Sequence, residues 1–221
     1  MRNSATLVGY TTWIGGNPNA TLVDAIAECA RVSNPSGPRR SSNERLVRYL
    51  VKERHWSPLE MANIVLDVRT DRTIARQVLR HKLDVQEFSQ RYSATETPSG
   101  VYETRMQDTI NRQNSLECDD AVLDDWWVHK QMTLRDEAFA LYDQALKKGI
   151  SKEIARNVLP EGLTYSRLFL NGKVRNWCHY VAARTSPDTQ KEHRDLAFKI
   201  VEAIEPVFPM ITDFVAKGVD T

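Results

Sequence analysis

The chain has 221 residues, with 30 Lys and Arg against 29 Asp and Glu, so its formal net charge is +1. This length predicts one domain over residues 1–221. The near-zero net charge argues against a nucleic-acid or membrane partner. Any anion site must therefore be formed by a local cluster of basic residues. Cys29, Cys118 and Cys178 are too scattered for a disulfide framework or a cysteine zinc site. With no recognisable signal peptide or membrane span, we expect a cytoplasmic protein without a bound metal.

In the first half of the chain, β-branched and aromatic runs predict strands, and apolar residues at helical spacing predict helices. Ser41-x-x-Glu44 has the form of a capping box, and Pro58 breaks the chain after the helix that this box begins. The expected elements are a strand over 5–13, helices over 21–33 and 41–54, a strand over 63–69, a helix over 70–82 and an extended segment over 88–93.

The second half begins with a polar, irregular segment over 94–120, which we expect to be a mobile loop. A long helix follows over 121–148, and Gly149 is expected to end it. Its apolar residues available for burial are Trp126, Met132, Phe139, Leu141 and Leu146. The remaining elements are a short helix from Ser151 to Pro160, a strand over 163–170, a turn at Asn171-Gly172, a helix over 174–184, a helix opened by the capping-box pattern Thr189-x-x-Glu192, and a short C-terminal helix after Pro209.

A row of arginines marks the predicted helix over 70–82. Arg69, Arg72, Arg76 and Arg80 recur at i+3 and i+4 and would share one face with no acid among them. Their mutual repulsion is easier to explain if an anion normally binds there, since guanidinium suits phosphate and carboxylate best. The alternative is a solvated face whose ion pairs are weak.

The residues around this row resemble the signature of the flavin-dependent thymidylate synthases. That signature reads Gln-x-x, Arg-His-Arg, seven residues, then Ser-x-Arg-Tyr. Here Gln77 leads into Arg80-His81-Lys82, and Ser89-Gln90-Arg91-Tyr92 closes the segment. The chain departs from the signature in two ways: Lys82 replaces the third basic residue, an arginine, and only six residues separate it from Ser89.

Further blocks occur in the same order as in that family, spanning roughly residues 21–205. They are Ala30-Arg31-Val32-Ser33, His55-x-Ser57-Pro58-x-Glu60, Ala155-Arg156-x-x-Leu159-Pro160 and Arg175-x-x-x-His179-x-x-x-x-Arg184. Several blocks in the right order are more specific than any one alone. His193, beside Arg194, is interpreted as a helix-surface residue, and Trp126-Trp127 as core or interface.

The resemblance implies an α+β fold, a small mixed sheet packed with long helices. It also implies reductive methylation of dUMP at C5 to dTMP. Methylenetetrahydrofolate would supply the carbon, and FAD reduced by NADPH would supply the hydride. Members of the family are homotetramers, and several subunits build each active site. The cofactor would perform the redox chemistry while the protein supplies binding and electrostatics.

The resemblance also implies which residues form the site. Arg184 would activate the pyrimidine. The nucleotide would be bound by Gln77, Arg80, Glu87, Ser89, Gln90, Arg91, Arg156 and Arg184. FAD would be contacted by Ser33, Ser57, Arg80, His81, Lys82, Gln86, Glu87, Arg175 and His179.

Other functions stay open at this point. One is C5 methylation or hydroxymethylation of another pyrimidine nucleotide, such as UMP, which Lys82 and the shortened loop keep in play. A second is a nucleotide-binding relative that has lost flavin. A basic nucleic-acid module is weaker, because the net charge is only +1.

Overall fold

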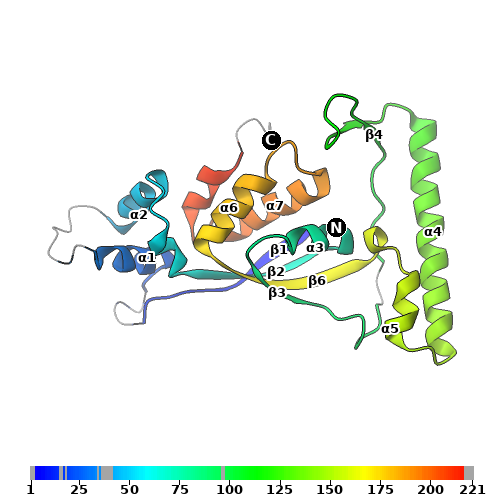
Figure 1. Cartoon of the computed structure of the whole chain (residues 1–221), viewed down its shortest axis with the longest axis horizontal. Coiled ribbons are helices and arrows are strands. Elements are labelled where there is room, and N and C mark those ends of the chain that lie inside the picture. Colours follow the sequence, from blue (N-terminus) through cyan, green and yellow to red (C-terminus); the bar gives the residue numbers. More distant parts are fainter. Residues whose placement is uncertain are drawn as a thin grey trace.

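The centre of the fold is a four-stranded sheet with helices on one face and further helices at both ends (Figure 1). This computed structural model describes residues 3–14, 17, 19–33, 35, 42–95 and 98–216. The strand order is β1-β2-β6-β3, with bounds β1 Ser4–Tyr10, β2 Asn63–Asp71, β6 Tyr165–Lys173 and β3 Asp84–Glu87. The expected α+β class is confirmed.

All pairings in this sheet are antiparallel, so the expected mixed sheet is corrected in that respect. The reason lies in the connections. The chain leaves β1 at Tyr10 and returns into β2 beside it, where Tyr10 pairs with Ile64. When a connection leaves one strand and enters its neighbour at the same end of the sheet, the two strands must be antiparallel.

Helices α3 (Arg72–Val78), α6 (Val174–Arg184) and α7 (Lys191–Ile204) lie over one face of the sheet (Figure 1). Alternate residues of β2 and β6 point to that face and are fully buried. They form one core with the helices, which includes Ile64, Leu66, Val68, Leu168, Leu170, Trp177, Tyr180, Leu196 and Ile200. The buried face of the sheet therefore fixes where the residues of α3, α6 and α7 lie.

One end of the sheet carries α1 (Leu22–Arg31) and α2 (Asn43–Lys52), followed by the short helix η1 (Ser57–Glu60). Thr21 caps α1 in a reciprocal capping box with Asp24. The cap expected at Ser41 lies outside the described residues. The side chain of Ser42 accepts the hydrogen bond from the backbone amide of Arg45, and α2 begins one residue later.

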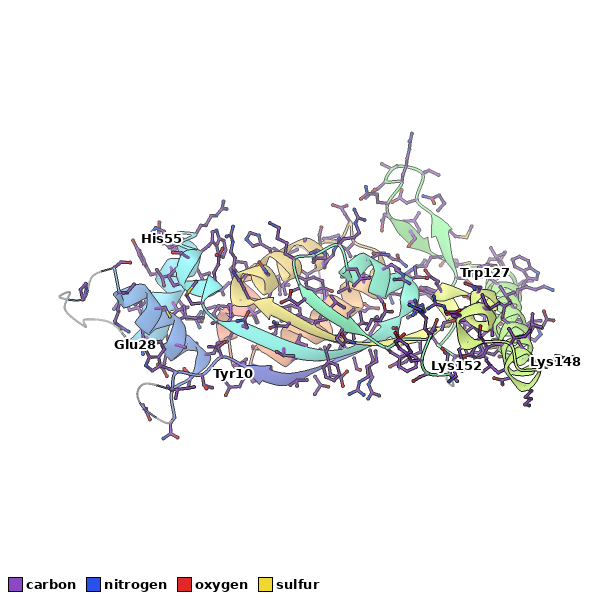
Figure 2. The ribbon with its side chains drawn as sticks, turned by 60° about the horizontal axis from the view of Figure 1, so that its bottom comes forward. Tyr10, Glu28, His55, Trp127, Lys148 and Lys152 are labelled. Atoms are coloured by element: carbon purple, nitrogen blue, oxygen red, sulfur yellow. The ribbon has the colours of Figure 1, made fainter. Side chains whose placement is uncertain are left out.

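The opposite end carries the long helix α4 (Ala121–Lys147), the short helix α5 (Lys152–Ala155) and η2 (Arg156–Val158) (Figures 1 and 2). Gly149 ends α4 with φ of 85°, as expected. Of the residues expected to be buried, Phe139 and Leu146 pack against a small cluster around Tyr142. The other three stay exposed in the single chain: Trp126 at 53%, Leu141 at 52% and Met132 at 40%.

The row of arginines is shorter than the sequence predicts. Arg69 belongs to β2, and Asp71 ends that strand and caps α3 by accepting from the amide of Ile74. Arg80 lies beyond the end of α3, so only Arg72 and Arg76 share the helix. The extended segment expected over 88–93 is also wrong, because Ser89 begins a turn. Residues 84–87, for which no element was predicted, form β3.

Asn171-Gly172 is not a turn, because both residues lie inside β6 and pair with Val65 and Ile64. Gly172 instead permits close packing. A Cβ there would lie 2.5 Å from a methyl of Leu83 and 2.9 Å from the indole nitrogen of Trp177. A glycine in a strand can mark such a close approach as well as a turn.

The last predicted cap is also wrong. Thr189 donates its hydroxyl to the carbonyl of Ala183, Gln190 is the N-cap of α7, and Glu192 binds Arg105. The 3₁₀ helix η4 (Pro209–Phe214) follows α7. The segment over 94–120 contains two short paired strands, β4 (Arg105–Gln107) and β5 (Ser115–Glu117). No helix in the described part of the chain could cross a membrane.

Candidate active site

A pocket of about 520 Å³ lies where the segment after α3 meets η1 and the start of α6. Its lining residues are Glu60, Arg80, His81, Lys82, Lys173, Arg175, Asn176 and His179. All five residues of the Arg80-His81-Lys82 and Arg175…His179 motifs therefore line one cavity, although more than ninety residues of sequence separate the motifs. The sequence analysis had assigned these residues to FAD.

The pocket carries a surplus of positive charge. Glu60 is the only carboxylate among its lining residues, and it is paired with Arg175. That hydrogen bond, with the nearby charges of Lys173 and Lys82, lowers the pKa of Glu60. Arg80, Lys82 and Lys173 remain to attract an anionic ligand.

An aromatic pair stands beside these cations. The rings of Trp56 and His179 lie 5.0 Å apart, and the guanidinium of Arg175 is 5.9 Å from the centre of the Trp56 ring. The amide of Asn176 donates to the carbonyl of Lys82 over 2.7 Å and ties the loop after α3 to α6. The cavity therefore combines cations, which suit phosphates, with the imidazole of His179, which packs against Trp56.

The imidazole of His81 lines the pocket and also contacts Arg184. Arg184 Nε donates to His81 Nε2 over 2.7 Å, so this nitrogen must carry a lone pair. Burial, reinforced by the charges of Arg184 and Arg80, lowers the pKa of His81 to about 4. At neutral pH His81 is therefore an uncharged acceptor that holds the guanidinium predicted to activate the pyrimidine.

Gln77, another predicted nucleotide ligand, lies in a buried polar network between α3 and α7. Its amide nitrogen donates to the side-chain oxygen of Gln190 over 2.7 Å, and its oxygen lies 3.1 Å from Nδ1 of His193. The interpretation of His193 as a surface residue is wrong: it is fully buried. Its other ring nitrogen lies 3.0 Å from the hydroxyl of Tyr180.

Glu87 forms a second cluster at the other end of α3. It accepts from Arg72 over 3.2 Å and from the hydroxyl of Ser166 over 2.7 Å, and Arg76 Nη1 is 3.9 Å away. Arg76 also pairs with Glu161. Arg72 and Arg76 therefore do have acidic partners, contrary to the expectation, because β3 and η3 (Glu161–Leu163) supply the carboxylates.

A third group of predicted ligands lies beside α5. Arg91 pairs with Glu153 at 3.7 Å, and Lys152 donates to the carbonyl of Tyr92. Arg156 belongs to η2, next to α5. Figure 1 places α5 at the far end of the molecule from α6, so one chain does not bring Arg91 and Arg156 to Arg184.

The remaining predicted residues do not line the cationic pocket. Ser57 is the first residue of η1, Ser33 follows α1, and Gln86 is exposed on β3. Ser89 accepts backbone hydrogen bonds from Tyr92 and Ser93 in a turn. Gln90 is buried, and its amide nitrogen has no partner within the described ranges.

Sequence reasoning missed Lys173, Asn176, Tyr180 and His193 as parts of the site. His193 directly follows Gln190-x-Glu192, which resembles a block of the same family downstream of Arg184, so the sequence marked its neighbourhood but not its burial. Within the described residues, no group of three or more His, Cys, Asp or Glu side chains could hold a metal ion.

The donor set of the pocket fits FAD. Its cations suit a pyrophosphate, the imidazole of His179 adds an aromatic ring to its lining, and the volume admits part of a dinucleotide. An antiparallel sheet covered by helices, with a cationic pocket that includes the imidazoles of His81 and His179, is the arrangement of a nucleotide-binding α+β protein.

Comparison with known proteins identifies the family. The family model described as "Thymidylate synthase complementing protein" matches residues 17–210. A flavin-dependent thymidylate synthase of Synechocystis is 42% identical over 187 residues, which cover 84% of this chain and 86% of the relative. A probable flavin-dependent thymidylate synthase of Paramecium bursaria Chlorella virus 1 is also 42% identical, over 98% of this chain and 99% of the relative. The chain belongs to this family.

A solved structure agrees with this assignment. The UMP/dUMP methylase PolB of Streptomyces cacaoi, bound with 5-Br UMP, superposes with a TM-score of 0.78 at 25% identity. The match covers 96% of this chain and 95% of PolB.

Proposed function

We propose that this protein is a flavin-dependent thymidylate synthase, which transfers a methylene group to C5 of dUMP and reduces it to the methyl group of dTMP. The carbon donor would be methylenetetrahydrofolate, the reductant NADPH and the cofactor FAD. The observation that carries the proposal is the convergence of Arg80, His81, Lys82, Arg175 and His179 on one pocket beside Arg184. Family membership supports the same reaction.

The cationic pocket would bind FAD. Arg80, Lys82 and Arg175 would bind the pyrophosphate, and the Trp56–His179 pair would border a ring system. FAD bound there, once reduced, would supply the hydride for the reaction. Glu60 fixes Arg175 by its ion pair, which reduces the freedom that this side chain would lose on binding the cofactor.

Arg184 would activate the pyrimidine electrostatically. C5 can attack a carbon donor only if electron density moves into the ring, and a cation near the ring oxygens stabilises that charge. His81 occupies the Nε of Arg184 and leaves the two terminal amino groups of the guanidinium for the nucleotide. Cys178 does not offer a competing nucleophile, because it is fully buried and burial raises its pKa.

The complete site would need more than one copy of the chain. At the α5 end, Arg91 pairs with Glu153 and Arg156 belongs to η2, whereas Arg184 is the last residue of α6, a helix that Figure 1 draws apart from α5. In a cytoplasmic homotetramer, that end of one subunit would meet the α6 side of another. The exposed apolar side chains of α4, including Trp126 and Leu134, support such a contact because they stay unburied in the single chain.

UMP is the second candidate substrate, and the likeness to a UMP/dUMP methylase is the observation that favours it. The two nucleotides differ only by the 2′-hydroxyl, so the choice depends on what faces that position in the assembled site.

One set of measurements tests both candidates. The purified protein, incubated with FAD, should have the two flavin absorption bands and quench flavin fluorescence. Reduced enzyme mixed with methylenetetrahydrofolate should then oxidise its flavin when dUMP is added. If the protein does not bind flavin, the alternative of a nucleotide-binding relative without flavin replaces the proposed function. If it turns over UMP and not dUMP, UMP replaces dUMP as the substrate.

A further inference from the structure

A continuous chain of hydrogen bonds runs from β4 to the candidate site. Arg105 donates to both carboxylate oxygens of Glu192, over 2.7 and 2.9 Å. Gln190 donates to the same carboxylate over 2.9 Å and accepts from Gln77 over 2.7 Å. Every member is half-buried or buried, so each hydrogen bond restricts the next side chain along the chain.

His193 extends this chain toward α6. The amide nitrogen of Gln77 is occupied by Gln190, so its oxygen accepts and Nδ1 of His193 must carry the proton. Nε2 of His193 then accepts from the hydroxyl of Tyr180. The neutral imidazole satisfies both neighbours, and burial together with the charge of Arg184 lowers its pKa to about 3.

Tyr180 connects the chain to His81. The two rings meet edge to face with centroids 4.8 Å apart, and the ring of His193 lies 6.3 Å from that of His81. His81 in turn accepts the hydrogen bond from Arg184. One buried pair of side chains, Tyr180 and His193, therefore contacts both Gln77 and the imidazole that orients Arg184.

We propose that His193 is a positioning residue of the nucleotide site. It fixes the carboxamide of Gln77 by a hydrogen bond, and it supports His81, and through it Arg184, by holding Tyr180. The inference rests on the proposed function, because that function assigns Gln77 and Arg184 to the pyrimidine. A packing role alone would be filled by any apolar side chain of similar volume, whereas positioning needs one donor and one acceptor at residue 193.

Two substitutions separate these roles. His193→Leu keeps most of the volume and removes both hydrogen bonds. His193→Gln keeps one donor and one acceptor on a planar amide, so it can pair with Gln77 and Tyr180 at once. Ile200→Val is the matched control, because Ile200 is fully buried on the same helix and belongs to the hydrophobic core.

His193→Leu leaves two buried polar groups without partners and is the variant most exposed to misfolding. The double variant Tyr180→Phe with His193→Leu removes the hydroxyl as well and keeps the core apolar. We therefore expect it to fold, with the hydrogen bond from residue 193 to Gln77 and the hydrogen bond that fixes the ring next to His81 both lost. Far-ultraviolet circular dichroism and FAD titration establish that each variant is folded and loaded.

The test is single-turnover oxidation of reduced flavin by dUMP and methylenetetrahydrofolate, with each variant saturated with FAD. We expect the rate to fall at least tenfold in His193→Leu and in the double variant. His193→Gln should recover most of the loss, and Ile200→Val should stay within twofold of wild type. A ¹⁵N spectrum of histidine-labelled wild type should place the proton of His193 on Nδ1.

The outcomes distinguish this inference from the function on which it rests. Wild-type protein that turns over neither dUMP nor UMP overturns the proposed function, and the inference with it. The inference alone is overturned if wild type is active and the folded double variant matches Ile200→Val. It is also overturned if His193→Gln is no faster than His193→Leu, or if Nε2 carries the proton.

Discussion

The Nε of Arg184 donates to the Nε2 of His81 over 2.7 Å, so this nitrogen of His81 carries no proton. A protonated His81 would present a hydrogen to Arg184 and place two cations in contact. Burial and the charges of Arg184 and Arg80 keep His81 neutral at pH 7. Arg184 thereby keeps its full charge beside an uncharged ring.

Arg184→Ala is expected to lose turnover while it retains FAD, because FAD is assigned to the neighbouring cations. Removing one preorganised donor of this kind costs on the order of 3 kcal/mol, or about a hundredfold in rate. Arg184→Lys should recover only part, since lysine keeps the charge and loses the planar fork. Single-turnover flavin oxidation measures the effect.

Arg194 provides the control for that experiment. It is on α7, and its guanidinium donates to the carbonyl of Pro187 at the protein surface. Arg194→Ala should leave the rate within about twofold, as is usual for surface substitutions. An Arg184→Ala enzyme that oxidises its flavin at the Arg194→Ala rate would show that Arg184 takes no part in the chemistry.

Lys82→Arg should change the affinity for FAD. The carbonyl of Lys82 is held by Asn176, so its backbone is fixed at the pocket, and a guanidinium there could bind phosphate through two hydrogen bonds. We expect a lower dissociation constant for FAD by fluorescence titration. Lys147→Arg on α4, the helix at the far end of the sheet, serves as the control. An unchanged constant would mean that residue 82 does not touch the cofactor.

Most elements of the fold were predictable because periodicity and caps are local signals. The strand around Val68, the long helix ending at Gly149 and the helix ending at Arg184 are confirmed within a few residues. The errors come from contacts distant in sequence. Asn171-Gly172 has turn composition, yet pairing with β2 and packing under Trp177 keep it in a strand.

The candidate site was predictable to the extent that its residues occur in recognisable motifs. Arg80, His81 and Arg175 came from such motifs, and the structure brings them to one pocket. His193 could not be placed in this way, because its burial depends on how α7 packs on α6. The acids that neutralise Arg72 and Arg76 lie on other elements, which no helix pattern can reveal.

Gly172→Ala is expected to destabilise the protein. Its new Cβ would lie 2.5 Å from Leu83 and 2.9 Å from Trp177, whose indole also donates to the carbonyl of Ile64. Overpacking of this kind typically costs about 1–3 kcal/mol. Gly9→Ala is the control, since its Cβ would meet nothing within 4 Å. Urea unfolding of the two variants should differ; equal midpoints would contradict the close packing.

Trp126→Glu should weaken the proposed tetramer. Trp126 is 53% exposed in the single chain, so a charge at this position costs little unless another subunit covers it. We expect sedimentation to reveal smaller species and turnover to fall with them. Lys148→Glu, beyond the end of the same helix, controls for the added charge. If the Trp126→Glu protein sediments like wild type, α4 does not form part of the subunit interface.

The free energy of unfolding should fall as the pH drops below about 6.5. His81 and His193 have pKa values near 4 and 3 in the folded protein, against 6.5 when unfolded. Between these values the unfolded chain binds more protons, so acid favours unfolding. The carboxylates with lowered pKa values, Asp24, Glu60, Asp67, Asp108 and Glu192, have unperturbed values of 3.8 to 4.5 and act mainly below pH 5.

The window between pH 5 and 6.5 therefore reports on the two histidines. His193 is enclosed by Tyr180, Gln77, His81 and Arg184, none of which is a carboxylate that could favour its charged form. One proton bound only by the unfolded state changes stability by about 1.4 kcal/mol per pH unit at most. The double variant Tyr180→Phe with His193→Leu should therefore have a flatter profile in urea unfolding at fixed protein concentration. His129→Gln on the exposed side of α4 should not flatten it. Parallel profiles for wild type and the double variant would show that His193 is charged in the folded protein.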